Sequence, residues 1–556
     1  MEILLTYKAH GKGSGDPYTA LLPVGLGSLN ALLRKEGHHS RVANLSTYSW
    51  HEISKLLADN PPSLLGVSQF THNRFESLRL ARMAKEANPE CFVVFGGPHA
   101  THRFNELLAQ NKIVDAVVVG EGEETFCELA RCLVTSENCD LRSVKGIAFR
   151  SGKDIVVTPP RPPLDDLDAL PLAAACFGDA LGVDAHRQME FIITSRGCPA
   201  SCSFCSSPRF WGKGLRFRSP RSIVDEIRYI RDHYGLIYFS IRDDTFTADR
   251  ERVREFCRLL LQEKIYILWN CQSRVNAVDE NVLSWMKRAG CECIQFGVES
   301  GSPRVLTTLG KGVTPEQVKW AAQAVRRAGI LLSVYLITGV PGESVQDLKQ
   351  TLRLLDAINA HDGQVSPLAY YPGTRLFEEG VRSGTVARDV FESDRREALY
   401  ARTDPLVARS TEELLARLAS VGRRSTFSEA DFLAQKKSLG YCHATNVMAG
   451  EMYEVKGKWR KAEAEYREIT VKEPENPWGW LMLGELFAKE GNFSLARDAF
   501  DALAHCVPAH APAYSSLGEL SRLAGNQRLA RKLYRKALAL DPGEKTAREG
   551  IRLVGN

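Results

Sequence analysis

The chain has 556 residues, of which 25% are charged and 44% are hydrophobic, and its formal net charge is +5. At roughly 150 residues per domain, this length predicts three or four domains. The composition is ordinary for a soluble globular protein, no apolar run approaches the ~20 residues of a membrane span, and the mild charge favours no nucleic-acid partner. The first ten residues, MEILLTYKAH, lack the pattern of an export signal, so we expect a cytoplasmic protein. The fourteen cysteines are mostly single within apolar segments, which favours reduced thiols over a disulfide framework.

Residues 1 to 135 alternate short apolar runs with helical patterns, which predicts a doubly wound parallel sheet in a Rossmann-like α/β domain. The expected strands are residues 3–5, 64–67, 91–95 and 115–119. Polar or glycine-rich turns follow three of them, with the sequences GVSQFT (66–71), GGPHAT (96–101) and VVGEGEET (118–125). Ligands of such sheets bind at the carboxyl ends of the strands, so these three turns should line one site.

Residues 136 to 189 lose this periodicity. The stretch TPPRPP (158–163) can continue neither a helix nor a central strand. We therefore expect a semi-rigid linker, of the kind that would hold one domain over another.

Three cysteines, Cys198, Cys202 and Cys205, form a C-x3-C-x2-C pattern just beyond the apolar run 191–194, which we interpret as a buried strand. Thiolates so spaced can wrap one face of a cubane [4Fe-4S] cluster and leave one iron free for a ligand other than protein. A structural zinc site or buried free thiols are the alternative. Zinc, however, usually takes a fourth protein ligand and C-x2-C pairs.

Residues 190 to 380 repeat strand and then helix, and six such units predict a partial (β/α)6 TIM barrel with its working face at the carboxyl ends of the strands. Polar blocks follow the expected strands in order. They are Asp243 to Phe246 after the second strand, Arg274 after the third, GVESG (297–301) after the fourth, GVPGE (339–343) after the fifth and PGT (372–374) at the close.

Residues 381 to 442 carry no cofactor pattern and are expected to form a helical connector of two helices. From 443 to 556 the chain repeats at a period of 34 residues, with glycines, alanines, aromatic residues and prolines at matching positions, as in Gly450, Gly484 and Gly518. This period resembles three tetratricopeptide repeats, which would form a short α-solenoid.

The cysteine pattern and the blocks that follow it resemble those of the radical S-adenosylmethionine (SAM) enzymes. The turns of the first domain resemble the cobalamin-binding domain found in one branch of that family. The resemblance implies that Cys198, Cys202 and Cys205 ligate a [4Fe-4S] cluster whose free iron chelates SAM. It implies SAM contacts from Phe204, Asp243, Asp244, Glu299, Ser300, Gly339, Pro341, Gly342 and Glu343. It implies cobalamin contacts from Ser68, Thr71, Gly96, Gly97, His99, Gly120, Glu121 and Gly122.

The sequence departs from the family pattern at two places. The common G-G-E block is replaced by Asp243-Asp244, so the group that receives the ammonium of SAM stays open, and Asp244 could equally cap the next helix. The D-x-H-x-x-G motif that ligates cobalt in other cobalamin domains is absent. His99 is the substitute candidate, although a histidine in a glycine turn more often bonds within its loop. A nucleotide-binding or ligandless Rossmann-like fold is the alternative for this domain.

The resemblance implies an enzyme that makes a 5′-deoxyadenosyl radical from SAM, and with cobalamin present we expect it to methylate an unactivated carbon. Non-methylating cyclisation, ring rearrangement or oxidation could use the same fold. A protein whose repeats bind partners around a non-catalytic core is the alternative from another class. The expected partners are a small-molecule or carrier-bound substrate, a low-potential electron donor such as flavodoxin or ferredoxin, and a protein held by the repeats. A solenoid that only buttresses the barrel is the competing interpretation.

Overall fold

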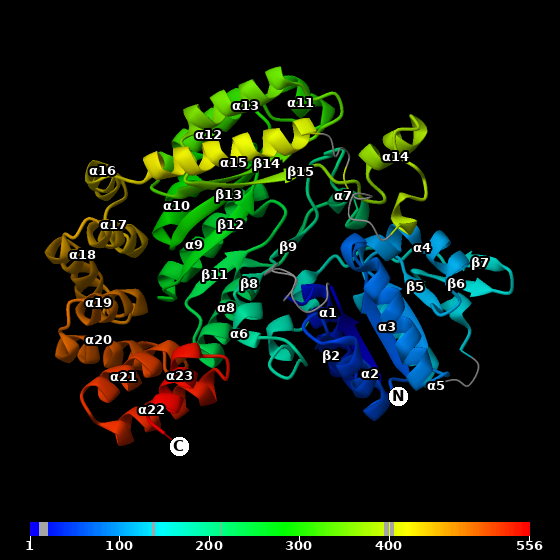
Figure 1. The fold of residues 1–556 in the computed structure, drawn as a ribbon, viewed down its shortest axis with the longest axis horizontal. Coiled ribbons are helices and arrows are strands. Elements are labelled where there is room, and N and C mark those ends of the chain that lie inside the picture. The colour runs from blue at the N-terminus through cyan, green and yellow to red at the C-terminus, as the bar shows by residue number, and fades with distance from the viewer. Residues whose placement is uncertain (10–20, 136–138, 213, 394–399, 401–404, 556) are drawn as a thin grey trace.

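Figure 1 shows the computed structural model, in which an N-terminal α/β domain, a central open barrel and a C-terminal helical solenoid follow one another along the chain. The structure describes residues 1–9, 21–135, 139–212, 214–393, 400 and 405–555. Within these ranges every helix is too short or too polar to span a bilayer.

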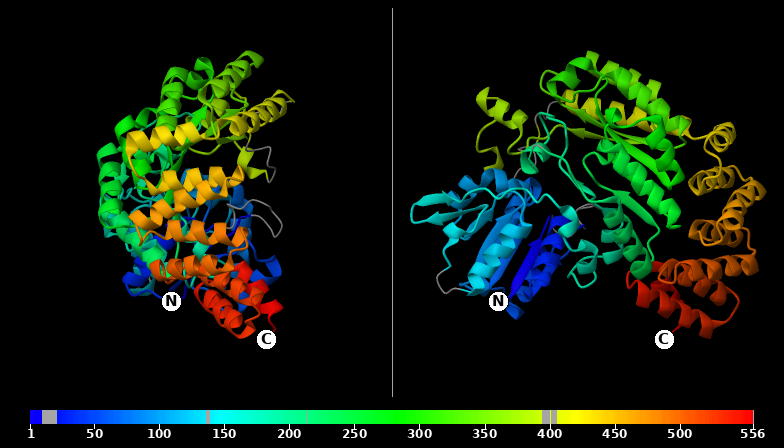
Figure 2. Two further views of the ribbon diagram at one scale, coloured as in Figure 1. Left: turned by 90° about the vertical axis from the view of Figure 1, so that its left-hand side faces the viewer. Right: turned by 180° about the vertical axis from the view of Figure 1, so that it is seen from behind.

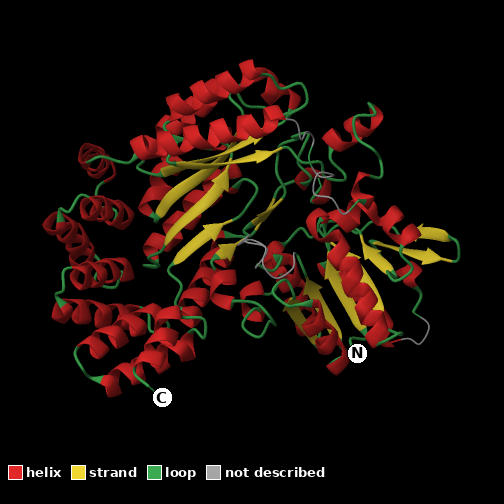
Figure 3. Cartoon of the chain, viewed as in Figure 1, coloured by secondary structure: helices red, strands yellow, loops and turns green. Residues whose placement is uncertain are grey.

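The N-terminal domain is built on a seven-stranded sheet in the order β2-β1-β3-β4-β5-β6-β7. The strands are β1 (Ile3–Tyr7), β2 (Ser40–Asn44), β3 (Leu64–Ser68), β4 (Phe92–Gly96), β5 (Ala116–Val118), β6 (Ile147–Ser151) and β7 (Asp154–Val157). The helices are α1 (Val24–Lys35), α2 (Trp50–Asp59), α3 (Arg74–Ala87), α4 (Pro98–Gln110) and α5 (Glu123–Thr135). Strands β1 to β5 are parallel, and helices lie against the sheet, as the expected doubly wound fold requires (Figure 3). Two clusters of buried apolar side chains pack the sheet against these helices.

Strands β6 and β7 correct the expectation that residues 136–189 are only a linker. They form an antiparallel hairpin that extends the sheet beyond β5. The sequence pattern missed them because the hairpin is an edge of the sheet, where β7 is only half-buried and its strand lacks a clear apolar alternation. The sequence pattern also failed to predict β2, because its sequence SRVAN is largely polar.

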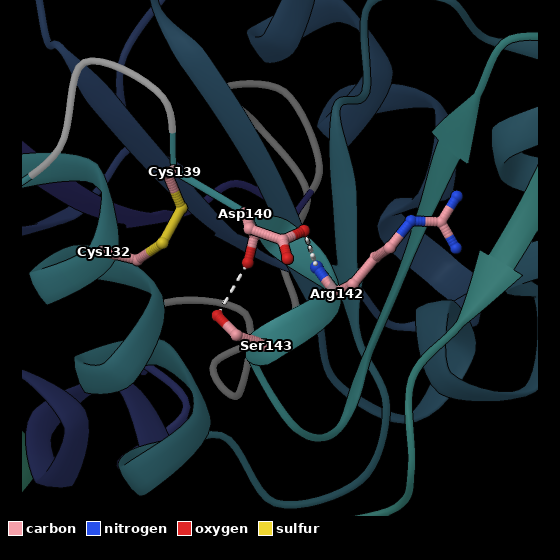
Figure 4. Close-up of a disulfide and its surroundings, with 5 residues drawn as sticks. All are labelled: Cys132, Cys139, Asp140, Arg142 and Ser143. Atoms are coloured by element: carbon pink, nitrogen blue, oxygen red, sulfur yellow. Dashed lines mark hydrogen bonds between the residues drawn. A yellow bond between two sulfur atoms is a disulfide. The ribbon is translucent and has the colours of Figure 1, made fainter.

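A disulfide between Cys132, on the last turn of α5, and Cys139 corrects the expectation that all the cysteines are reduced (Figure 4). Their Cα atoms lie 5.3 Å apart, which is within the usual span of such a bond. The other twelve cysteines are free thiols. Spacing alone did not reveal the pair, because whether two thiols meet depends on where the chain turns after the helix.

The central domain is an open sheet of six parallel strands in the order β15-β14-β13-β12-β11-β8, which confirms a partial barrel that does not close. Its strands are β8 (Phe191–Ile192), β11 (Tyr238–Ile241), β12 (Leu268–Ser273), β13 (Cys291–Glu299), β14 (Leu331–Thr338) and β15 (Asp362–Pro367). The helices that cover its outer face are α8 (Pro220–Tyr234), α9 (Arg250–Gln262), α10 (Glu280–Arg288), α12 (Pro315–Arg327), α13 (Val345–Ile358) and α15 (Pro405–Ser425).

Helix α15 belongs to the barrel, although it lies in the region expected to be a connector. Its Leu414 and Leu418 are buried in the barrel core, and a Cβ on Gly363 of β15 would meet Leu418 at 3.0 Å. Only α16 (Glu429–Leu439) then bridges to the solenoid. The predicted barrel boundary at residue 380 was therefore too early, because an amphipathic helix has the same pattern whether it covers a barrel or a solenoid.

The solenoid consists of α17 (His443–Val455), α18 (Trp459–Lys472), α19 (Pro477–Lys489), α20 (Phe493–Cys506), α21 (Ala511–Leu523), α22 (Gln527–Leu540) and the closing helix α23 (Lys545–Leu553). In each pair the repeated glycine receives the repeated aromatic ring of the partner helix, and a Cβ on Gly450, Gly484 or Gly518 would meet that ring at 2.1 to 2.7 Å. The period of 34 residues therefore has the packing origin that the sequence predicts.

The loops between repeats dock on the amino ends of the barrel strands, so the solenoid lies on the side of the barrel away from the N-terminal domain (Figure 2). Glu475 pairs with Lys264 ahead of β12 at 2.9 Å. The Nδ1 atom of His510 lies 2.7 Å from the carbonyl oxygen of Gly235 ahead of β11. A third loop places Asp541 beside His186 ahead of β8, at 3.4 Å. Successive repeats thus brace successive strands.

Candidate functional site

The cysteine loop leaves β9 (Ser195–Arg196) and is held from two sides. The backbone N–H of Ser203 donates a hydrogen bond to the carbonyl of Leu309, and the carbonyl of Ser203 accepts a hydrogen bond from the backbone N–H of Leu376, both at 2.8 Å. The thiol of Cys198 lies 3.5 Å from the hydroxyl of Thr245, just past the end of β11. These bonds place the loop over the carboxyl ends of the barrel strands, as the sequence predicted.

The three cysteines lie within eight residues of one another on this loop. Burial raises the pKa of Cys205 to about 12, and the negative charges of Asp244, Cys202 and Cys198 add to the shift, which requires those groups to be near. No three His, Cys, Asp or Glu side chains in the described part of the chain are placed around a single metal ion. A cubane cluster needs a wider spacing, because each thiolate binds a different iron. The donor set of three thiols with no fourth protein ligand therefore fits a [4Fe-4S] cluster and not a closed zinc site.

The two neighbouring aspartates after β11 have different surroundings. Asp243 is fully buried, and its carboxylate accepts hydrogen bonds from the backbone N–H and the hydroxyl of both Thr194 and Ser195. Asp244 lines a cavity between the N-terminal domain and the cysteine loop, accepts a hydrogen bond from the hydroxyl of Ser207, and has a pKa raised by burial. Asp249 caps the next helix, so Asp244 is not its N-cap. Of the two, Asp244 is the group that a ligand can reach.

The GVESG block forms a strained turn at the end of β13. Glu299 has a left-handed backbone with φ of 65°, and its buried carboxylate forms an ion pair with Lys311 at 2.7 Å. Ser300 is also buried and bonds to Thr351 on α13. Both predicted SAM contacts are thus engaged within the protein, so they can shape the turn that a ligand meets.

The GVPGE block after β14 is a compact turn in which Glu343 accepts a hydrogen bond from the backbone N–H of Gly339 at 2.6 Å. Gly342 has φ of 78°, and with Pro341 it is exposed at the tip. Phe204, from the cysteine loop, packs in the same apolar cluster as Val340 of this turn. The ring and the turn thus lie together, as expected if they border one adenine.

One cavity of about 600 Å³ joins the N-terminal domain to the cysteine loop. From the N-terminal turns it is lined by Ser68, Gly96, Gly97, Gly120, Glu121 and Gly122, and from the barrel by Cys205, Ser207 and Asp244. Gly97 and Gly120 have φ of 94° and 88°, so a side chain is disfavoured at both. The backbone of Gly120 has open space beside it, which leaves room for a ligand to approach closely.

The same cavity continues into the core of the N-terminal domain, between its sheet and the helices α1 and α5. Leu5, Gly66 and Phe126 line this deeper part. A Cβ on Gly66 would meet Leu5 at 2.7 Å and Phe126 at 3.0 Å, so only glycine leaves these side chains where they are. The cavity thus extends from the strand ends towards apolar side chains of the domain core.

Two of the residues expected to contact cobalamin do not line this cavity. His99 is buried on α4, 3.1 Å from the hydroxyl of Thr71, and packs edge-on against Phe391 of the chain that follows the barrel. Burial, with the charges of Arg74 and Arg103, lowers the pKa of His99 to about 3. The structure therefore places His99 in the contact between the two domains, where its ring is enclosed by protein.

Glu121 forms ion pairs that the sequence did not reveal. Its carboxylate forms ion pairs with Arg196 and Arg216, which lie on the two strands of the hairpin that flanks the cysteine loop. It also accepts a hydrogen bond from the backbone N–H of Leu164. Arg196 also pairs with Glu123 and lies over the ring of Trp211 at 5.2 Å. These contacts tie the third N-terminal turn to the cluster loop.

A second group of polar residues points inward from the barrel strands and was also missed. The amide oxygen of Gln295 on β13 accepts hydrogen bonds from Tyr335 at 2.9 Å, Arg242 at 3.3 Å and Gln272 at 3.4 Å. These side chains come from four adjacent strands and are only half-buried. Their period of two within each strand was the signal that could have found them.

Comparison with known proteins agrees with this geometry. The family model of the radical SAM superfamily matches residues 192–355, the B12 binding domain matches 16–130, and tetratricopeptide repeats match 448–511 and 481–545. An uncharacterised methyltransferase of Pyrococcus horikoshii is 32% identical over 364 residues, which are 65% of this chain and 78% of that protein. The chain belongs to the radical SAM superfamily.

Other relatives of this radical SAM protein differ in their reactions. The anaerobic magnesium-protoporphyrin IX monomethyl ester cyclase of Rubrivivax gelatinosus is 27% identical over 68% of this chain and 70% of its own. The radical SAM methyltransferase TsrM of Kitasatospora setae, solved with tryptophan and a SAM analogue, has a similar fold, with a TM-score of 0.60 and 22% identity over 70% of this chain and 77% of that one. The matched domains make this protein an enzyme that uses a [4Fe-4S] cluster, SAM and cobalamin.

Proposed function

We propose that this radical SAM enzyme transfers a methyl group to an unactivated carbon of a small-molecule or carrier-bound substrate. When bound, the cluster would supply the electron that cleaves SAM, and cobalamin would carry the methyl group. The observation that supports the proposal is the single cavity in which glycine turns of the B12 domain and the cysteine loop meet. A corrin held on one wall of this cavity would be next to SAM held on the other.

In this proposal, Cys198, Cys202 and Cys205 hold the cluster, and Asp244 receives the ammonium group of SAM. The other acidic residues that line the cavity, Glu121, Glu123 and Glu226, are each paired with an arginine, whereas the structure gives Asp244 no ion pair within the described residues. Phe204 and the turn 339–343 border the adenine. The remaining residues position these groups. Asp243 fixes the strand that precedes the cysteine loop, and Lys311 holds Glu299 in its strained turn.

In this proposal, glycine turns hold the cobalamin, and His99 does not ligate the cobalt. That ring is enclosed by Thr71 and Phe391, and a neutral imidazole buried beside two arginines has no path to the cavity. The apolar slot beside Gly66 takes the nucleotide tail. Ser68, Gly96, Gly97, Gly120 and Gly122 then face the corrin.

The experiment is anaerobic turnover of the reconstituted enzyme with SAM that carries a CD3 group, in the presence of cobalamin and a reductant. Methyl transfer consumes SAM in two ways, so S-adenosylhomocysteine and 5′-deoxyadenosine should both form, and a product should gain the CD3 group. Formation of 5′-deoxyadenosine alone, with no labelled product from a small-molecule extract, would favour a non-methylating reaction.

For the reaction to run in a cell, a low-potential donor such as flavodoxin or ferredoxin would deliver electrons, and we propose a cytoplasmic location because cluster assembly needs free thiols. Tetratricopeptide repeats are protein-interaction modules. Here the inter-repeat loops dock on the barrel, which supports a bracing role, and the surface that remains would be open to a partner or carrier.

A further inference from the structure

Arg274, the first residue after β12, is a buried arginine aimed at the cysteine loop. Its side chain is among the buried charged groups, with the residue 7% exposed. One guanidinium nitrogen lies 3.6 Å from the sulfur of Cys202, and another donates to the carbonyl oxygen of Lys311. It also lines a second cavity of about 890 Å³, which reaches the outer side of the cysteine loop at residues 199–201.

The charge of Arg274 is not balanced by direct contact with a described carboxylate. Within the described part of the chain its guanidinium is in no ion pair with a carboxylate. The nearest acidic side chain of the turn, Glu299, is already paired with Lys311. A buried arginine without an anionic partner is costly, because its charge has lost the solvation of water and gained no opposite charge in return.

We infer that Arg274 is the counter-charge of the iron–sulfur cluster, and that it positions Cys202 and raises the reduction potential of the cluster. The inference rests on the cluster and is independent of methyl transfer. Thiolates and sulfides bound to iron are anionic, so they supply the charge that the protein does not. The N–H group that faces Cys202 in the structure would then donate a charge-assisted hydrogen bond to a cluster ligand.

The effect on the potential follows from charge. Reduction adds one negative charge to the cluster, and a nearby positive group stabilises the reduced form more than the oxidised form. Hydrogen bonds to the ligand sulfurs act in the same direction. Arg274 should therefore make the cluster easier to reduce by a cellular donor.

The experiment is a redox titration, followed by electron paramagnetic resonance, of reconstituted full-length enzyme with and without SAM. We expect Arg274→Gln to lower the midpoint potential and Arg274→Lys to lower it less, since lysine keeps the charge but loses the planar fork. Arg250→Gln is the matched control. Arg250 lines the same second cavity, but it is paired with Asp279 at 3.1 Å and its side chain is 41% exposed, so its loss should leave the potential unchanged.

Iron content, measured in every variant, separates redox tuning from loss of the cluster. A wild-type potential in fully loaded Arg274→Gln would overturn the inference, as would an equal shift in Arg250→Gln. If Arg274→Gln takes up no iron while Arg274→Lys loads normally, the counter-charge is required for assembly and the inference stands. If neither variant loads and both melt at a lower temperature in the apo form, Arg274 is a folding residue and the inference fails.

Discussion

At the scale of single residues, adjacent side chains in the site do different work because their burial differs. Asp243 and Asp244 follow one another in the chain, yet one is enclosed by hydrogen-bond donors and the other opens on the cavity. The cysteines of the loop are likewise distinguished from the other thiols by their place past the strand ends, with Thr245 beside Cys198 and Arg274 beside Cys202.

Replacement of Cys205 by alanine tests the cluster directly. We expect the reconstituted wild-type protein to hold about four irons and Cys205→Ala to hold few, because a cubane with only two protein ligands is poorly retained. The matched control is Cys506→Ala, which removes a half-buried thiol from α20 and should leave the iron content unchanged. Full iron loading in Cys205→Ala would contradict the assignment.

Replacement of each aspartate by asparagine should affect a different property of the protein. Asp243→Asn replaces an acceptor of four hydrogen bonds by a side chain that also donates, so we expect a loss of about 2 kcal/mol or more in unfolding free energy. Asp244→Asn should change the unfolding free energy by no more than ~0.5 kcal/mol and weaken SAM binding about tenfold. Urea unfolding and equilibrium binding of SAM check both; equal SAM affinity in Asp244→Asn and wild type would rule out the ammonium contact.

His99 should make the protein sensitive to acid. Its folded pKa, about 3, lies below the unfolded value of roughly 6.5, so below pH 6.5 the unfolded chain binds a proton that the folded one does not. Stability is therefore lost as the pH falls from about 6.5 towards 3, by up to ~1.4 kcal/mol per pH unit. We expect melting curves between pH 7 and 5 to show a weaker pH dependence in His99→Gln. The control is His51→Gln, an exposed histidine on α2, and an unchanged slope in His99→Gln would refute the explanation.

At the scale of elements, the solenoid and the barrel meet through loops. Gly235 ends α8 with φ of 69°, and a Cβ there would meet the carbonyl oxygen of Ala509 at 2.3 Å. The close approach allows the second inter-repeat loop to seat His510 against the barrel. Docking of the solenoid thus depends on a close backbone contact that leaves no room for a side chain at position 235.

Gly235→Ala should separate this docking from the cost of a left-handed residue. Gly457, at the end of α17, has φ of 67° with nothing near its would-be Cβ, so Gly457→Ala should cost only about 1 kcal/mol. We expect Gly235→Ala to lower the melting temperature further and to speed proteolysis between barrel and solenoid. Equal melting temperatures in the two variants would show that the loop contact adds nothing to stability.

At the scale of the whole molecule, the B12 domain is held over the barrel by charged contacts at two places. Glu121 bridges to Arg196 and Arg216 beside the cysteine loop. On the far side, Arg74 donates to the carbonyl of Phe391. The relative position of the two domains therefore depends on a few side-chain contacts between them.

Glu121→Gln should loosen this arrangement. The carboxylate lies between two arginines, so its loss leaves Arg216 without its ion pair and leaves Arg196 with Glu123 alone, and should cost about 3 kcal/mol. Glu36→Gln is the control, because it breaks an ion pair with Arg131 whose arginine is 58% exposed, and should cost less than ~1 kcal/mol. Cobalamin retained after desalting should fall in Glu121→Gln at unchanged iron content. Equal retention in both variants would remove Glu121 from the domain contact.

The sequence by itself determined the three folds and the repeat period, and it predicted the cysteine ligands of the cluster. Each of these is a local pattern: apolar periodicity within an element, or a spacing of a few residues along one loop. Local patterns can be recognised without knowledge of the fold, because they depend only on which residues share a face of an element or a turn. The turns at 96–97 and 120–122 were found for the same reason, since they need glycine for their own backbone.

Only the tertiary structure decided which of these residues share a cavity. Thr71 and His99 stand in the same turns as Ser68 and Gly97, yet packing against Phe391 removes His99 from the site. The sixth barrel helix, the hairpin after β5 and the disulfide were also fixed by contacts between distant segments. Arg274 gives the physical reason: whether a buried charge serves a cofactor depends on which partners surround it, and those partners come from parts of the chain that only folding brings together.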